Sequence, residues 1–246
     1  MIIDPDALPG CPEQFGSRLA ASVASWREAG KRGIWLRLPT ALAALAGPAA
    51  AQGFDFHGAD RGYVTMTRWL PDGPCTLPAG ASHQVGVGAI VTNARRDKIL
   101  TVLERNGPLK GTGVYKMPTG LSDPGEDVVD AAVREVKEET GIDCVPEGVI
   151  AIRQMHGATA GKSDLFFVVG CRVSGGEEIA VQQSELEDAK WMPLDEYAAI
   201  GFMRSRPLYA KIVDRCVAWA RGEVGVMRGE RLDSGLGRGE QLLFFL

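Results

Sequence analysis

The chain has 246 residues, of which 45% are hydrophobic and 24% charged, so it has enough apolar surface for one large globular domain or two smaller ones. Its net charge is −4 and its basic residues are scattered, so neither a nucleic-acid groove nor an anionic-membrane patch is indicated. The five cysteines contain no CxxC pair, which argues against a disulfide framework or a zinc site and favours reduced thiols.

The first residues give no indication of a targeting or membrane segment. MIIDPDALPG is acidic where a signal peptide would be basic. The most apolar early run, ALAALAGPAAA, is too short to span a bilayer and is interrupted by Pro48. We therefore expect a cytoplasmic protein.

Residues 1–80 are expected to form a small N-terminal α/β domain. RGIWLRLP and YVTMTRWLP, which begin at Arg32 and Tyr63, have the β-branched and aromatic content of strands. Thr40 is placed to cap the helical run between them, and this order predicts a βαβ-like unit. Segment 71–82 is rich in Pro and Gly and predicts a linker, with the domain boundary near residue 80.

Residues 81–205 combine strand-like segments with one amphipathic helix, which predicts an α+β domain. HQVGVGAIV, KILTVLE, GVIAIRQM and KSDLFFVVGCRV are predicted strands, and the helix lies between the second and the third. Residues 206–246 are expected to form a C-terminal helix and tail packed on this domain. The helix lies in LYAKIVDRCVAWARGE, and a Gly-rich loop follows until LLFFL restores a strand-like end.

The amphipathic helix is predicted to run from Asp127 to Thr140. Asp127 is expected to cap its N-terminus, and Gly141 is expected to end it in the left-handed conformation. At helical spacing the valines and alanines of this segment form one apolar arc. One face of the helix should therefore be buried in the domain core.

Three glutamates, Glu135, Glu138 and Glu139, form an arc beside this apolar face. Like charges three or four residues apart destabilise a helix by roughly 0.2–0.5 kcal/mol per pair, and partial burial adds to that cost. One alternative is an ordinary solvated acidic face. The other is a divalent cation, because carboxylates are the hard ligands that Mg²⁺ or Mn²⁺ prefers, and Mg²⁺ takes further ligands from substrate phosphates.

The surrounding pattern favours the cation. Residues 120–142 fit G-x5-E-x7-R-E-U-x-E-E-x-G-U, where U is a bulky aliphatic residue, and this pattern resembles the Nudix box at every defined position. RGIWLRLP, GFDFHGAD, YKMPTGLSDPGED and WMPLDEYA resemble the Nudix subfamily with an extra N-terminal (pre-Nudix) domain. That subfamily includes plant pyrophosphatases of ADP-ribose and NADH and the animal Nudix protein encoded antisense to a fibroblast growth factor gene.

The resemblance implies a Nudix α/β/α sandwich preceded by a small acetyltransferase-like α/β domain. It also implies that Glu135, Glu138 and Glu139 are metal ligands and that Arg134 pairs with Glu126. The pairing is chemically reasonable, since a glutamate near a metal cluster needs a cationic partner and Arg offers a planar bidentate fork.

Further site residues are less sharply defined by the sequence. Glu185 stands where the family often adds a later carboxylate, with Glu187 as its rival and two surface charges as the alternative. Lys116 precedes the box and is expected to reach a substrate phosphate, although an edge lysine would look the same. His57 and His83 are not expected to be catalytic. Phe166, Phe167 and Trp191 are expected in the core, and Tyr115 replaces a Trp that is usual in the family.

The resulting expectation is a Mg²⁺- or Mn²⁺-dependent pyrophosphohydrolase of a nucleoside diphosphate linked to another moiety, with ADP-ribose or NADH favoured. Glu139 or Glu185 would act as the base, and the N-terminal domain would support substrate affinity or a homodimer. Two alternatives remain. One is a non-catalytic nucleotide-binding protein that regulates a partner, and the other is a Nudix-fold isomerase of allylic diphosphates.

Overall fold

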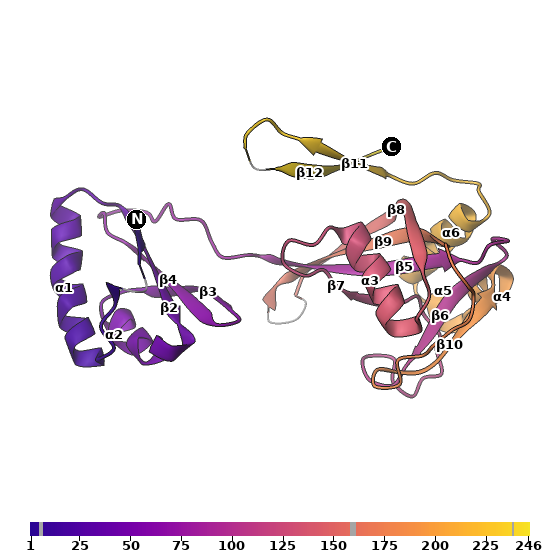
Figure 1. Ribbon diagram of the computed structural model, residues 1–246, viewed down its shortest axis with the longest axis horizontal. Helices are drawn as coiled ribbons and strands as arrows, with labels where there is room; N and C mark the ends of the chain where they lie inside the picture. Colours follow the sequence, from indigo (N-terminus) through magenta and orange to yellow (C-terminus); the bar gives the residue numbers. More distant parts are fainter. Residues whose placement is uncertain (5–6, 158–160, 238) are drawn as a thin grey trace. The chain divides into compact units, whose positions relative to one another are not determined.

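The computed structural model describes residues 1–4, 7–157, 161–237 and 239–246. The chain divides into two compact units, Met1–Ser82 and His83–Leu246 (Figure 1). Within the described ranges, no helix is long and apolar enough to cross a membrane.

The N-terminal unit is a four-stranded sheet in the order β1-β2-β4-β3, covered by helices. Its core includes Phe15, Leu19 and Val23 of the first helix, α1, which pack against alternate residues of the inner strand β2. The elements in chain order are β1 (Ile2–Ile3), α1 (Pro12–Glu28), β2 (Gly33–Pro39), the 3₁₀ helix η2 (Thr40–Leu45), α2 (Ala46–Ala51), β3 (Asp55–Asp60) and β4 (Tyr63–Trp69).

The two predicted strands of this unit are confirmed as β2 and β4, but the βαβ-like prediction is wrong. The strands pair antiparallel, with Gly33 opposite Trp69, because β3 lies between them in the sequence and forms a hairpin with β4. Thr40 is the first residue of η2 and not its cap, since Pro39 holds the cap position without a side-chain hydrogen bond. Helix α1 was not predicted.

The second unit is built on a mixed sheet in the order β10-β6-β5-β9-β8, with the short β7 also paired to β5. β5 and β9 run parallel, and the other pairs are antiparallel. Its elements are β5 (His83–Thr92), β6 (Lys98–Glu104), β7 (Thr119–Leu121), α3 (Val128–Thr140), β8 (Cys144–Met155), β9 (Ser163–Val173), β10 (Leu186–Pro193), α4 (Leu194–Ala198), α5 (Gly201–Arg204), α6 (Pro207–Ala220), β11 (Arg228–Asp233) and β12 (Glu240–Phe245).

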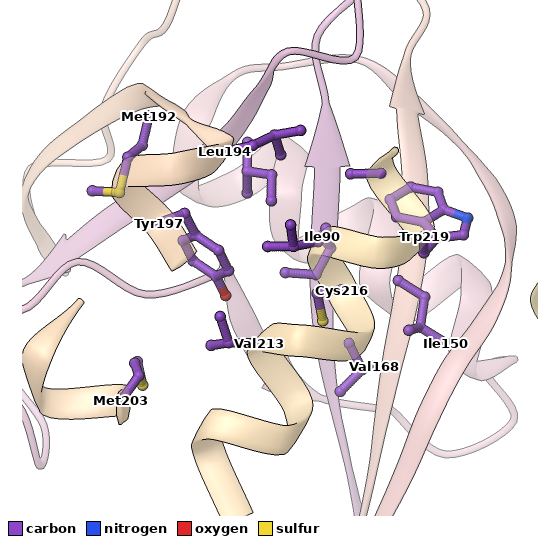
Figure 2. Packing of buried hydrophobic residues seen from close by; sticks show 13 residues of the cluster. Ile90, Ile150, Val168, Met192, Leu194, Tyr197, Met203, Val213, Cys216 and Trp219 are labelled. Carbon is purple, nitrogen blue, oxygen red and sulfur yellow. The ribbon is translucent and has the colours of Figure 1, made fainter. Parts of the chain in front are cut away.

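Helices cover both faces of this sheet and give three layers. On one face, α3 packs Ala131, Ala132 and Val136 against residues of β5, β8 and β9. On the other face, α4, α5 and α6 contribute to a second apolar cluster, in which Trp219 of α6 and Ile150 of β8 lie close together (Figure 2). The architecture is therefore the expected α/β/α sandwich.

The C-terminal segment belongs to the same compact unit. The predicted helix is confirmed as α6, but the Gly-rich stretch after it is not loop throughout. Strands β11 and β12 pair as an antiparallel hairpin, with Arg231 opposite Leu242. Arg231 also pairs with the carboxylates of Asp127 and Asp130 in the first turn of α3.

Candidate active site

The helix that carries the glutamates begins and ends close to the predicted residues. Asp127 holds the N-cap position in an extended conformation, but its carboxylate pairs with Arg231 and makes no capping hydrogen bond. Gly141 ends the helix with φ of 71°, in the left-handed region that a residue with a side chain rarely adopts. These two termini place all three glutamates within α3.

Arg134 ties the loop before α3 to the helix. Its Nε donates to Glu126 Oε1 at 2.8 Å and its Nη2 to Glu126 Oε2 at 3.0 Å, which is a bidentate contact. Nη2 also donates to the carbonyl oxygen of Leu121 at 2.9 Å. The bond from Arg134 is the main reason why the pKa of Glu126 lies below its ordinary value. Glu126 is thereby kept ionised and fixed in position.

The same guanidinium reaches two of the three helix glutamates. Its Nη1 lies 2.8 Å from Glu135 and 3.3 Å from Glu138. Glu135 packs directly over Gly120, where an added Cβ would lie 2.0 Å from the carboxyl carbon. Gly120 is therefore required by close approach. Burial raises the pKa of Glu135, and the contact with Arg134 opposes that effect.

Glu139 is the most deeply buried of these carboxylates. Its residue is only 5% exposed, and Oε2 has no hydrogen-bond partner among the described residues. Burial raises the pKa of Glu139 to about 7, although the charge of Lys116 and the backbone N–H of Thr119 act to lower it. The charges of Glu135 and Glu185 add to the upward shift.

Glu185 thus lies within electrostatic reach of this cluster. Its charge raises the pKa of both Glu135 and Glu139, whereas Glu187 is a cause of neither shift. Of the two rivals in the sequence, the geometry brings Glu185 toward the helix. Its backbone is held in place, because the N–H of Arg105 donates to its carbonyl oxygen at 2.9 Å.

The described residues contain no group of three His, Cys, Asp or Glu side chains already arranged around one metal position. Arg134 instead draws Glu135 and Glu138 together, and Glu138 keeps 53% of its side chain exposed. The donor set nevertheless fits a hard divalent cation, because it is made of carboxylate oxygens. The unpartnered Oε2 of Glu139 is a buried acceptor that such a cation would satisfy.

Lys116 lies beside this cluster but has protein partners. Its ammonium group is 2.8 Å from Glu104 Oε1 and donates to the hydroxyl of Thr119 at 2.5 Å. Both side chains of the Lys116–Glu104 pair are largely buried. Glu104, which ends β6, could not be singled out from the sequence, because its contact with Lys116 joins two segments twelve positions apart.

A cavity of about 420 Å³ opens next to the carboxylates. We call it the aromatic cavity, since its lining includes Phe166, Tyr197, Phe202 and Tyr209, with Thr119 and Lys116 also in its wall. Figure 2 shows the hydroxyl of Tyr197 directed toward Val213, which also lines the cavity. Phe166, expected in the core, is thus a cavity residue.

A second cavity, of about 450 Å³, adjoins the first. We call it the polar cavity, because Gln84, Arg153 and Asp164 line it. Pro108, Thr119, Arg153 and Phe166 line both cavities, and Gly120 lines the polar cavity alone. The two cavities therefore meet beside the residues that contact Glu135 and Glu139.

Comparison with known proteins is consistent with this arrangement. The profile of the NUDIX domain matches residues 82–214, and that of the Nudix hydrolase domain matches residues 1–70. The chain belongs to the Nudix hydrolase family. Members of this family generally use divalent metal ions and act on small nucleotide-linked substrates.

Relatives extend over both units. The chain is 43% identical to Nudix hydrolase 2 of Arabidopsis thaliana over 216 residues, which are 87% of this chain and 77% of that protein. It is 42% identical to the human nucleoside diphosphate-linked moiety X motif 6 over 187 residues, 75% of this chain and 58% of that protein. These relatives support the subfamily resemblance.

Solved structures include an ADP-ribose pyrophosphatase from Streptococcus suis. It is 26% identical, with a TM-score of 0.43 over 58% of this chain and 95% of that one. A NUDIX hydrolase from Nitrosomonas europaea is 27% identical, with a TM-score of 0.44 over 58% of this chain and 92% of that chain.

One residue of this Nudix hydrolase departs from the subfamily pattern and has a clear local role. Tyr115, which replaces the usual Trp, donates its hydroxyl to Asp188 at 2.5 Å, and this bond raises the pKa of Tyr115 to about 12. Lys190 lies over its ring at 4.4 Å. Tyr115 therefore links the segment before the Nudix box to β10.

Proposed function

We propose that the chain hydrolyses the pyrophosphate bond of a nucleoside diphosphate linked to a second moiety, with Mg²⁺ or Mn²⁺ as cofactor. The observation that carries the proposal is Glu139. It is a buried carboxylate with a free oxygen atom, on the helix of the Nudix box, and its neighbour Thr119 lines both cavities. Stability alone would not favour such a group, because an unpaired buried acceptor costs free energy.

The chemistry of the carboxylates supports a role for each. Glu135, Glu138 and Glu139 would hold the divalent cation, for which Glu138 would give up its 3.3 Å contact with Arg134. When bound, the cation neutralises the diphosphate and lowers the pKa of a water molecule. Glu139 or Glu185 accepts the proton from the attacking water, since both lie in the cluster.

Two other side chains position these groups. Arg134 pairs with both Glu126 and Glu135 and so ties the loop before α3 to the helix face that packs on Gly120. Lys116 would bind a phosphate oxygen after release from Glu104, because it lines the aromatic cavity and its ammonium group donates to Thr119, which lines both cavities. Neither residue takes part in bond making.

The favoured substrates are ADP-ribose and NADH. The aromatic cavity offers rings of Phe166, Phe202 and Tyr209 for a nucleobase, and the adjoining polar cavity leaves room for a second moiety. The human relative is a nucleoside diphosphate-linked moiety X motif protein, which supports the broader class of nucleoside diphosphates linked to a second moiety. The net charge of −4 argues for a small substrate over a long RNA.

The direct test is a competition between NADH, ADP-ribose and a capped oligonucleotide at two salt concentrations, with Mg²⁺, with Mn²⁺ and with a chelator. We expect higher kcat/KM for the dinucleotides, weak salt dependence, and activity that a chelator abolishes. Preferential decapping would overturn the substrate proposal while leaving hydrolysis standing.

Product analysis separates hydrolysis from the other two activities. In water labelled with heavy oxygen, hydrolysis places one labelled atom in a phosphorylated product. An isomerase would return a product of unchanged mass, and a protein that only binds nucleotides would return the substrate. Either of these two outcomes would overturn the proposal.

A further inference from the structure

A further cavity of the second unit, of about 700 Å³, is not used by the proposed chemistry. We call it the arginine cavity, because four arginines and a single carboxylate are its charged lining residues. These residues are Arg95, Arg96, Glu147, Arg221 and Arg228, and none of the five lines the aromatic or the polar cavity.

The strands separate the arginine cavity from the helix glutamates. Arg95 and Arg96 follow the last residue of β5, whereas Gly86, near its first residue, lines the polar cavity. In β8, Glu147 lies near the start and Arg153 near the end. A strand rises about 3.3 Å per residue, so the part of β5 beyond Gly86 alone spans roughly 20 Å. The arginine cavity is therefore a separate site, at the opposite ends of these strands.

The carboxylate in this cavity is already fully matched by cations. Arg96 donates to both oxygen atoms of Glu147, from Nη1 at 3.3 Å and from Nη2 at 3.1 Å. Arg172 lies 3.4 Å from the same carboxylate. Glu147 consequently has no negative charge left to balance the other arginines of the lining.

The remaining three arginines are weakly held. Arg95 lies 3.5 Å from Asp97, and Arg221 lies 2.7 Å from Asp195, and both pairs are exposed to solvent. Arg228, the exposed first residue of β11, takes part in none of these ion pairs of the described chain. Since exposed ion pairs contribute little free energy, the two aspartates do not hold their arginines against a competing anion.

Arg96 gives the cavity a preformed wall. Among the described residues, it is the one residue other than glycine with a positive φ, of 58°, a conformation that side chains rarely adopt. Its guanidinium lies 5.0 Å from the ring centre of Trp219, and its Nε donates to the carbonyl oxygen of Ala220 at 3.4 Å. The arginine thus satisfies the C-terminal end of α6, where the helix dipole is negative, and this end does not repel an anion.

The guanidinium groups indicate which anion the cavity suits. Arginine offers a planar fork of N–H donors, and a phosphate group, with several terminal oxygen atoms, accepts from more than one fork at a time. The volume of about 700 Å³ is typical of sites for small organic ligands and exceeds what a phosphate ion needs. Trp219, Val224 and Val226 supply apolar wall for the rest of such a ligand. We propose that the arginine cavity binds the phosphate group of a phosphorylated small molecule, at a second site separate from the Nudix helix.

This proposal does not depend on the proposed hydrolysis, and two probes without a pyrophosphate bond test it. They are inorganic phosphate and phenyl phosphate. Their binding to the full chain is measured by calorimetry in a buffer free of phosphate and sulfate, with a chelator, so that no divalent cation draws either probe to the helix glutamates. We expect both to bind saturably, and phenyl phosphate to bind at least about threefold more tightly, because its ring contacts the apolar wall.

A double variant, Arg95→Gln with Arg228→Gln, assigns the site. Both side chains are exposed, so the fold should persist, and the preformed wall stays intact. The matched control is Arg18→Gln with Arg61→Gln, which removes the same charge from two exposed positions of the first unit. Because charge-assisted hydrogen bonds are the strong ones, we expect the Kd of each probe to rise at least about tenfold in the first variant and less than about twofold in the control.

Four results would overturn the proposal. Absence of saturable binding to the wild type would show that the cavity binds no phosphate, and an unchanged Kd in the first variant would place the bound phosphate elsewhere. An equal loss of affinity in the control would show a general effect of net charge. Equal affinity for the two probes would show a site for the free ion alone, without a place for the organic part of the ligand.

Discussion

The two units of the chain bury different kinds of residue. In the described part of Met1–Ser82, every buried side chain is apolar, from Phe15 in α1 to Leu70 after β4. The unit His83–Leu246 also has two apolar clusters, yet it buries Glu139 and Asp164 as well. In the described residues, the first unit thus buries no ionisable residue, whereas the second buries two carboxylates.

The difference indicates where function resides. A buried carboxylate is retained only if partners or ligands compensate its desolvation, and in both cases the compensation within the chain is incomplete. Glu139 has a free Oε2, and the Arg153 partner of Asp164 has a free Nε. Asp164 lines the polar cavity, and Glu139 accepts a hydrogen bond from the backbone of Thr119, which lines both cavities, so this comparison favours the second unit as the site of chemistry.

The largest effect is expected for Glu139→Gln, which tests whether the buried carboxylate of the second unit is needed for activity. Glutamine has nearly the same shape, so the fold should persist, but it loses the negative oxygen that the cation requires. We expect kcat to fall by at least about a hundredfold, as also for Glu138→Gln. The measurement is steady-state kinetics at saturating Mg²⁺ with circular dichroism to verify folding.

Glu187→Gln serves as the matched control for this experiment. Glu187 is exposed and does not perturb the helix glutamates, so its activity should stay close to that of the wild type. Full activity of Glu139→Gln would show that the buried carboxylate is structural and would remove the contrast between the units.

A smaller effect is expected for Arg134→Lys. Lysine keeps the charge but cannot make the bidentate contact to Glu126 together with the bonds to Glu135 and Leu121. We expect kcat/KM to fall by about tenfold, since a misplaced catalytic group is costly even when it is retained. Wild-type kinetics for this variant would remove the Glu126 contact from the proposed site.

Local signals predicted the Nudix helix well. The helical period, the capping position of Asp127 and the glycine at Gly141 all lie within a short segment, so the predicted span 127–140 differs from α3 by one residue. The resemblance to the Nudix box implied the pairing of Arg134 with Glu126, and the structure has this contact. These features require no knowledge of the tertiary fold.

Features that depend on tertiary contacts were not predictable. The sequence of α1 has only a narrow apolar stripe, made of Phe15, Leu19 and Val23. This stripe can be recognised as a buried face only when the sheet that packs against it is known. The hydrogen bond from Gln84 to Asp164 spans 80 positions, and strand register alone brings the two residues together. The strand-like end expected at LLFFL lies in β12, but its partner β11 was hidden in a Gly-rich segment, because β11 is exposed and lacks a buried apolar face.

The comparison also predicts a limited effect of removing the first unit. Because no ionisable residue is buried in the described part of the N-terminal unit, we expect deletion of residues 1–82 to leave kcat nearly unchanged and to raise KM by roughly threefold or to alter the oligomeric mass. Kinetics combined with light scattering would test this. A well-folded truncated protein without activity would place catalytic groups in the first unit and contradict the contrast.

The smallest expected effect concerns Tyr197, which lines the aromatic cavity. Its side chain is fully buried, and its hydroxyl has no hydrogen-bond partner among the described residues. An unpaired buried hydroxyl costs about 1–3 kcal/mol, so Tyr197→Phe should stabilise the protein. For a chain of this size, about 1 kcal/mol corresponds to an increase in Tm of about 2–4 °C.

Leu36→Ala in β2, which leaves a cavity in the purely apolar core of the first unit, should instead destabilise it. The measurement is the Tm of both variants by calorimetry without ligand. Removal of a polar atom from the second unit should raise the Tm, and removal of apolar atoms from the first unit should lower it. A lower Tm for Tyr197→Phe would mean that a bound water satisfies the hydroxyl, and that this buried polar group does not destabilise the second unit.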